Sequence, residues 1–380
     1  MKYREPLSAA TKYTIVVAFA VYSAYNLVLT ALQDYILFLS GEAGTLGTAF
    51  GIFTLSAVLS RFLSGLIIEK IDDAAALVIG NVVLTLTLGW YSLASNIATV
   101  YVIRAVQGFG WALSTVTILT MISENTESVR MSAALGYLNV FGSLSLMFFP
   151  VIGSWIITIQ SLENFIFCFQ IGFGIGIIST LLSICVWRSI PPVLEHEVPI
   201  SGMPERAVLT PTISIALLFI PHGLLLSYSP EVAVLHGIDN PGLFFTAFAF
   251  AQIIGSVFGG VWTGNSQYRG VASIGAVFVV GGITTLVILT DIIGYIIAAA
   301  LIGFGLASAN IALNSFVSSV STKSEAKGMA IYSAGVDSAI ALGSFAAALL
   351  LGLGMGIPSI LSLFTIAALA SAVHSLLTIE

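Results

Sequence analysis

The sequence predicts an all-α membrane protein with twelve transmembrane helices arranged as two similar six-helix halves. Three observations predict it: the composition, a series of apolar runs of span length, and a repeat of sequence features at a spacing of 195 residues. Hydrophobic residues make up 58% and charged residues 8% of the 380 residues, and the mean hydropathy is +1.05. Soluble domains carry about 25% charged residues. A chain of this composition belongs in a lipid bilayer.

The apolar runs are long enough to be helices that cross the membrane, because a span needs about 20 apolar residues. They are apolar on every face and rich in Leu, Ile, Ala and Gly, whereas the strands of a β-barrel are short and alternating. Six runs fall in each half. The expected spans are residues 13–39, 45–68, 74–93, 98–122, 131–159, 165–187, 212–228, 243–262, 271–290, 292–317, 329–351 and 357–377.

The repeat indicates a duplicated chain. Gly65 and Gly260 are 195 residues apart, and the Gly-Phe-Gly motif at 108–110 recurs at the same spacing at 303–305. The expected organisation is an amino-terminal half (1–190), a cytoplasmic linker (191–210) and a carboxy-terminal half (211–380). The linker contains His196 between two glutamates, but adjacent residues in a flexible loop lack the fixed geometry of a zinc site, so no metal is expected.

The placement of basic residues predicts that both termini are cytoplasmic, because Lys and Arg set orientation and acidic residues contribute little. We expect a multi-pass protein of the plasma membrane. The basic residues assigned to the cytoplasmic side are Lys2, Arg4, Lys12, Lys70, Arg130, Arg188, Arg206, Arg269, Lys323 and Lys327. The opposite loops hold only acids, namely Glu42, Glu163, Glu231, Asp239 and Asp291.

The first span carries a polar stripe. Tyr22, Asn26 and Gln33 lie near one face at helical spacing, and Asp34 follows near the outer end. Such a stripe faces a bundle interior or a water-filled cavity, since lipid cannot satisfy its hydrogen-bonding groups. It predicts either a solute path or ordinary hydrogen bonds between helices. Asp34 is a candidate outward-facing acceptor of a proton or cation, and a solvated loop acid is the alternative.

Two motifs resemble those of a known transporter family. Gly65-x-x-x-Glu69-Lys70, between the second and third spans, resembles motif A of the major facilitator superfamily. Arg104-x-x-Gln107 followed by a glycine, in the fourth span, resembles that superfamily's motif B. The resemblance covers essentially the whole chain, including six plus six spans and a linker.

A third motif and one departure complete the resemblance. Gly136, Pro150 and Gly153 match three positions of motif C, whereas Ser145 and Phe149 stand where the family has glycines. Residues 72–74 (Asp-Asp-Ala) replace the glycine and basic pair that end motif A, so its positive cluster is reduced to one lysine. The resemblance implies the twelve-helix fold of the superfamily, with a weakened cytoplasmic lock.

The seventh span is predicted to be broken. The sequence Pro221-His222-Gly223 interrupts it, and Ser-Pro-Glu231 closes it. Broken helices in transporters commonly line the substrate path, which makes His222 and Glu231 candidate path residues; a hydrogen-bonded packing role is the alternative for His222. The loop that follows, at 236–245, resembles that of efflux-type members of the superfamily.

Arg61 and Asp337 are predicted to pair across the two halves. Arg61 lies about 12 Å along its helix from the cytoplasmic end, and Asp337 about 15 Å along its own. Since the resemblance implies that the second and eleventh helices pack together, the pair would form the inner rung of a cytoplasmic gate and Glu69 the outer one. The alternative is that each residue is satisfied within its own half.

Arg104 is the other cation within a span. A buried guanidinium must be paired or hydrated, so we expect Arg104 in a central cavity, where it binds substrate or controls protonation. A structural role, in which backbone carbonyls bind Arg104 and hold the helices together, is the alternative.

The leading functional reading is a secondary active transporter that works by alternating access, with proton-coupled efflux of a small organic solute favoured and proton-coupled uptake left open. Few charges line the spans, which favours a neutral, cationic or amphipathic solute. No Walker A motif occurs. An integral membrane enzyme would need a second acidic motif besides Asp72 and Asp73, and a channel would need rings of carbonyls or charges. We expect a monomer without cofactor, metal or nucleic-acid partner.

Overall fold

The computed structural model describes residues 7–68, 71–189, 206–263, 267–321 and 325–379. These residues form twelve α-helices and one 3-10 turn, and they contain no strand. The amino-terminal half contains α1 (Ala9–Ser40), α2 (Gly44–Ile68), α3 (Asp73–Trp90), η1 (Tyr91–Leu93), α4 (Ile97–Glu124), α5 (Ser128–Ile156) and α6 (Leu162–Ser189). The carboxy-terminal half contains α7 (Arg206–Leu235), α8 (Gly242–Thr263), α9 (Tyr268–Ile288), α10 (Ile292–Val320), α11 (Glu325–Gly352) and α12 (Ile357–Thr378).

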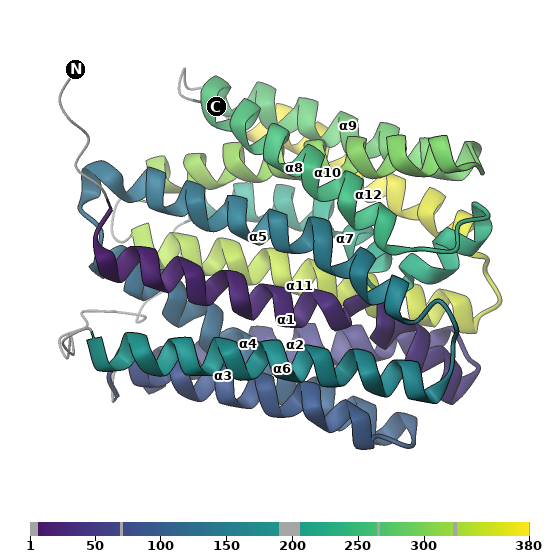
Figure 1. Ribbon diagram of the computed structural model, residues 1–380. Helices are drawn as coiled ribbons and strands as arrows, with labels where there is room; N and C mark the ends of the chain where they lie inside the picture. The colour runs from purple at the N-terminus through teal and green to yellow at the C-terminus, as the bar shows by residue number, and fades with distance from the viewer. Residues whose placement is uncertain (1–6, 69–70, 190–205, 264–266, 322–324, 380) are drawn as a thin grey trace.

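The predicted fold class is confirmed. Within the described residues, eleven helices, all except α2, are long and apolar enough to cross a membrane. The helices run lengthwise through one bundle, with both chain ends at the same end of it (Figure 1). We call that end, where α1 begins, the inner end, and the end at which α1 finishes the outer end. In the view of Figure 1, α1, α5, α7 and α11 lie between the remaining helices of the two halves.

Local sequence signals explain where many helices begin and end. Ser8, Asp72, Asn96 and Asp291 precede α1, α3, α4 and α10, and each side chain accepts the backbone N–H of the residue three positions on. These bonds satisfy donors that a helix start leaves without a partner. Gly41 ends α1 with φ of 67°, a left-handed conformation that glycine adopts without strain.

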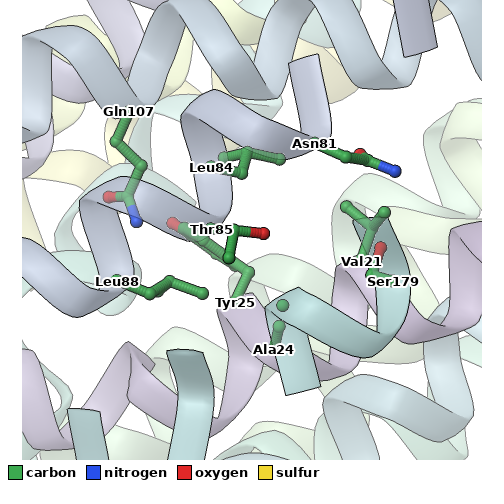
Figure 2. Close-up of a pocket in the computed structure, with 10 residues that line it drawn as sticks. Val21, Ala24, Tyr25, Asn81, Leu84, Thr85, Leu88, Gln107 and Ser179 are labelled. Carbon is green, nitrogen blue, oxygen red and sulfur yellow. The ribbon is translucent and has the colours of Figure 1, made fainter. Parts of the chain in front are cut away.

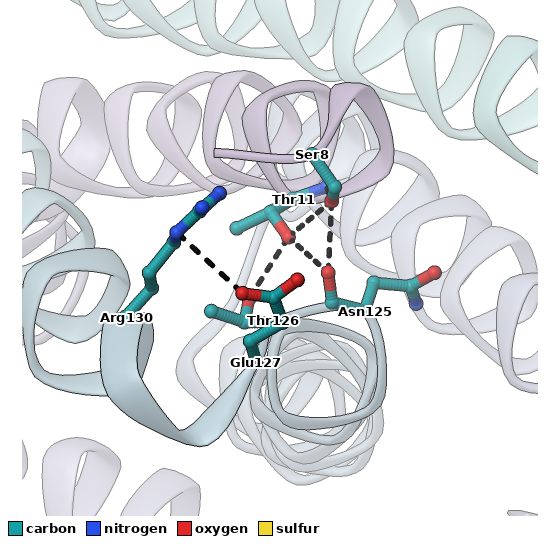
Figure 3. A network of polar contacts seen from close by, with 6 residues as sticks. All are labelled: Ser8, Thr11, Asn125, Thr126, Glu127 and Arg130. Carbon is teal, nitrogen blue, oxygen red and sulfur yellow. Dashed lines mark hydrogen bonds and ion pairs between the residues drawn. The ribbon is translucent and has the colours of Figure 1, made fainter. Parts of the chain in front are cut away.

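The start of α1 is fastened to the connection between α4 and α5 (Figure 3). The Ser8 and Thr11 hydroxyls both donate to the carbonyl of Asn125, at 2.8 and 3.0 Å, and the hydroxyls of Thr11 and Thr126 lie 2.9 Å apart. All of these residues belong to the amino-terminal half. The network therefore holds the inner end of that half together as a unit.

The two halves meet mainly along two helix pairs, α2–α11 and α5–α8, and α7 makes smaller contacts with both α1 and α2. Small residues permit the close approach. A side chain at Gly47 would collide with the backbone of α11 at Ser344, and one at Gly242 would collide with α5 next to Pro150. Packing through small residues is how membrane helices associate, because lipid supplies no hydrophobic force between them.

The prediction that Pro221-His222-Gly223 interrupts the seventh span is wrong, because the backbone there is helical, whereas the predicted end of the span at Ser-Pro-Glu231 coincides with a kink. α7 extends from Arg206 to Leu235 with three prolines inside it, and it consists of two helical segments that meet at its one non-helical residue, Tyr228 (φ −120°, ψ 24°). The distortion belongs to Pro230, two residues further on, because a proline ring crowds the preceding turn and lacks the N–H that would bond to the carbonyl four residues earlier.

Candidate functional site

A set of polar contacts, which we call the outer seam, joins α1 and α2 to α7 at the outer end. Gln33 is fully buried. Its Nε2 donates to the carbonyl of Leu226 at 2.5 Å, and its Oε1 accepts the Ser229 hydroxyl at 2.8 Å. The backbone N–H of Gly47 donates to the Tyr228 hydroxyl at 3.0 Å. Each contact crosses from one half to the other.

Two carboxylates, one from each half, lie beside the outer seam. Asp34 follows Gln33 and is 8% exposed. Glu231 follows the kink in α7, and neither of its carboxylate oxygens has a hydrogen-bond partner on another described residue. The two side chains interact electrostatically across the halves. Burial of two like charges without a cation is unfavourable, and the role of these residues in accepting a proton or another cation stays a prediction.

The α5–α8 contact includes two hydrogen bonds between the halves. The Thr246 hydroxyl donates to the carbonyl of Met147 at 2.6 Å, and the Ser143 hydroxyl donates to Gln252 Oε1 at 3.2 Å. These bonds lie from the middle of the two helices towards the outer end. They fasten the halves on a second side.

Arg61 and Asp337 form an ion pair nearer the inner end, so the predicted pairing is present. Arg61 Nε donates to Asp337 Oδ2 at 2.6 Å, and the side chains are 21% and 19% exposed. This is the only ion pair between the halves among the described residues. Its role as a gate stays a prediction. Gly65 lies on α2, but Glu69 and Lys70, like His196 of the linker, lie outside the described residues.

Arg104 is enclosed within the amino-terminal half. It is 1% exposed, and its guanidinium carbon lies 4.3 and 4.1 Å from the ring centres of Phe50 and Phe53. Nη1 donates to Gln107 Oε1 at 2.9 Å and Nε to the carbonyl of Ala49 at 3.3 Å, whereas Nη2 has no hydrogen-bond partner among the described residues. The aromatic faces stabilise the charge, and the predicted role in binding or protonation stays a prediction.

The polar stripe of α1 reaches three different neighbours. Gln33 contacts α7, as described above, and Asn26 Nδ2 donates to the Ser145 hydroxyl of α5 at 3.0 Å. The ring of Tyr22 lies 5.6 Å from that of Trp111 on α4. For Asn26 the geometry is an ordinary bond between helices, and it explains why a serine stands at this motif C position.

Sequence reasoning missed the aromatic cluster centred on Trp111. The Trp111 ring lies 4.7 Å from Tyr25 and 6.2 Å from Phe53, and Tyr25 stacks on Phe53 at 5.4 Å. Phe53 also covers Arg104. Trp111 follows Gln107 by four residues, so the two share one helix face, and that spacing was the available signal.

The remaining predicted residues lie apart from these contacts. The His222 ring stacks on Phe248 at 5.2 Å, and its Nδ1 has no hydrogen-bond partner among the described residues. Of the motif C residues, Gly153 allows close approach to the backbone of α1, and the carbonyl of Pro150 accepts the Thr30 hydroxyl at 3.0 Å. Gly136 borders open space.

A small cavity lies inside the amino-terminal half between α1, α3, α4 and α6, with room for about one water molecule. Asn81 and Ser179 are 1% and 2% exposed, and Asn81 Nδ2 and Ser179 Oγ lack hydrogen-bond partners among the described residues. Figure 2 shows Gln107 on the opposite side from these two. The lining residues are Val21, Ala24, Tyr25, Asn81, Leu84, Thr85, Leu88, Gln107, Gly176 and Ser179.

Solved structures share this fold along the whole chain. The nucleoside transporter NupG superposes with a TM-score of 0.80 at 11% identity, covering 98% of this chain and 100% of that one. A bacterial homolog of the human lysosomal transporter Spinster, in an inward-facing and unoccupied conformation, gives a TM-score of 0.73 at 12% identity, with 98% and 96% coverage. At such identities the similarity concerns the fold alone.

Sequence comparison adds a relative and a family. A probable vesicular acetylcholine transporter-B of Danio rerio is 29% identical over 138 residues, which are 34% of this chain and only 28% of that protein's length. The sequence profile of the Major Facilitator Superfamily matches residues 14–240, more than half of the chain. Together with the twelve-helix architecture, this match shows that the chain belongs to the Major Facilitator Superfamily.

Proposed function

We propose that this membrane transporter exports a small organic solute in exchange for protons by alternating access. The observation that carries the proposal is the division of contacts between the halves: the outer seam at one end and the Arg61–Asp337 pair nearer the other. Two separable closures between two similar halves are what alternating access requires, since one side must open while the other stays shut.

The acidic pair at the outer seam supports coupling to protons. Asp34 and Glu231 come from different halves and lie close enough to repel each other when both are ionised. A proton that binds from outside while the outer side is open would favour closing, because closing brings the two carboxylates together, and solute arriving from the inner side would then displace the proton inward. Protonation would therefore be linked to the position of the halves.

The solute is proposed to be neutral or cationic. Described residues at the interface supply aromatic, amide and carboxylate groups, and the Arg61 cation there is already neutralised by Asp337. A cation could take the place of the proton at Asp34 and Glu231. The names of the similar proteins fit this range, because acetylcholine is a cation and nucleosides are largely neutral. We further propose a monomer in the plasma membrane with both termini in the cytoplasm.

A binding screen and a flux assay test the proposal together. Purified protein in detergent would be heated with choline, ethidium or uridine, and a compound that binds only the folded protein raises its melting temperature. The hit would then be followed in proteoliposomes with an internal pH-sensitive dye.

Export coupled to protons predicts that an inward solute gradient drives protons outward, and that a pH gradient alone drives the solute against its gradient. Movement of solute and protons in the same direction would replace exchange by uptake symport. Solute movement indifferent to the pH gradient would refute coupling.

A further inference from the structure

The outer seam depends on a backbone carbonyl that a proline has left without its helical partner. In a helix, the carbonyl of Leu226 would accept the N–H of residue 230. Residue 230 is proline, which has no N–H to donate. A buried carbonyl without a partner is unfavourable, so such groups are almost always satisfied elsewhere. Here the partner is Gln33 Nε2, which belongs to the other half of the protein.

The geometry fixes the orientation of the Gln33 amide. A carbonyl oxygen can only accept, so the group that faces Leu226 must be the NH₂ of Gln33. The amide oxygen then points to Ser229, whose hydroxyl donates to it at 2.8 Å. Gln33 and Ser229 are 0% and 2% exposed. One side chain thus holds both sides of the kinked turn of α7.

We propose that Gln33 is the outer latch of the transport cycle and that Pro230 creates its docking site by leaving the carbonyl of Leu226 free. The latch forms when the outer ends meet. It breaks when they part, and water then satisfies the same groups. The inference rests on the proposed alternation of the two halves.

The position of Pro230 makes the device specific. α7 contains three prolines, at 211, 221 and 230, and each removes one helical N–H. Among the described residues, only the carbonyl freed by Pro230 receives a hydrogen bond from the opposite half. The non-helical turn at Tyr228 lies next to it, and the Tyr228 hydroxyl accepts a second bond across the seam, from Gly47.

The test measures how often the outer seam opens. The side chain of Ala348 on α11 lies against Gly47 of α2 at the outer end, so Ala348→Cys reports opening when a membrane-impermeant maleimide is added from outside. All variants would carry Cys185→Ser, because the exposed Cys185 would otherwise react with the maleimide. Cys168 is buried and is kept. Gln33→Met keeps the volume of the side chain and removes both bonds. We expect labelling to rise about five- to thirtyfold, since each net hydrogen bond changes an equilibrium by roughly a factor of five and two bonds are lost.

Pro230→Ala is the discriminating variant. It restores the N–H at position 230, which returns the carbonyl of Leu226 to its own helix and straightens the turn. Labelling should rise, and less than in Gln33→Met, because a carbonyl has a second lone pair. In Gln33→Met combined with Pro230→Ala, labelling should not exceed that of Gln33→Met alone, because the restored N–H satisfies the carbonyl that Gln33→Met leaves without a partner. Pro211→Ala is the matched control and should label like the parent.

The outcomes separate the latch from unfolding and from transport itself. The melting temperature of Pro230→Ala should equal or exceed that of the parent, because alanine is the better helix residue. Unchanged labelling in Gln33→Met, or additive effects of the two changes, would overturn the latch. Labelling needs no solute, so a wild-type chain that moves no solute refutes the proposed transport and leaves the labelling result to decide the latch.

Discussion

Breaking the Arg61–Asp337 pair should open the inner side of the protein. The ion pair is a charge-assisted hydrogen bond of 2.6 Å whose side chains are 21% and 19% exposed. Hydrogen bonds to charged groups contribute about 1.5–3 kcal/mol, and surface ion pairs at most about 1 kcal/mol. A pair that is four-fifths buried lies between these limits. We therefore expect about 1–2 kcal/mol, or a roughly five- to thirtyfold change in the equilibrium between inner-closed and inner-open states.

The assay is a double-mutant cycle with a reporter cysteine. Ser143→Cys lies midway along α5, where the native hydroxyl contacts Gln252 across the halves. In inverted vesicles the inner end of the protein faces the medium, so an impermeant maleimide added there reaches this cysteine only when the inner side is open. Arg61→Ala and Asp337→Ala should each raise labelling, and the double variant should raise it no further. The exchange of Arg61→Asp with Asp337→Arg should restore the parental value.

Additive effects of the two alanine changes would refute the proposed gate, because a bond that both residues share can be lost only once. So would failure of the exchanged pair to restore closure while the protein remains folded. Either outcome would favour the alternative in which each residue is satisfied within its own half.

Three further predictions follow from the site. Arg104→Lys keeps the charge and loses the bonds to Gln107 and the backbone, so transport should fall at least about tenfold with unchanged yield of folded protein; equal loss of both would make Arg104 structural. Asp34→Asn should flatten the pH dependence of transport, with Glu231→Gln as the second test; an unchanged profile would remove the coupling role. Ser179→Val should fill the small cavity and lower the melting temperature by about 2–4 °C, more than Ser179→Ala does; equal effects would argue against a bound water.

The fold could be predicted from sequence because its signals are collective. Composition, span length and the 195-residue repeat each involve many residues, so the loss of one signal leaves the others. The Arg61–Asp337 contact was also predictable, because two lone charges within spans had matching depths. A single pair of depths, combined with the packing that the family resemblance implied, was enough to bring two residues together that lie 276 positions apart.

The sequence placed breaks in α7 at Pro221 and at Pro230, and only the second coincides with the kink, because the prolines offer the same local signal. Which of them bends the helix depends on what satisfies the freed carbonyl, and at Pro230 the partner, Gln33, is distant in the chain. The environment of Arg104 was missed for a similar reason. A buried cation suggests a polar cavity, whereas here two aromatic faces and an amide enclose it. The spacing of residues within α4 cannot predict that aromatic rings of α2 pack against Arg104.

The central claim is that the two halves alternate between an outer closure at Gln33 and an inner closure at Arg61 and Asp337. The most direct measurement compares labelling from outside at Ala348→Cys with labelling from the inner side at Ser143→Cys. Both are measured in Gln33→Met and in Arg61→Ala. Alternation of one equilibrium predicts reciprocal effects: Gln33→Met raises outer and lowers inner labelling, and Arg61→Ala does the reverse. If both sites become more reactive together in either variant, or if each responds without the other, the two closures are not alternatives of one equilibrium and the account is contradicted.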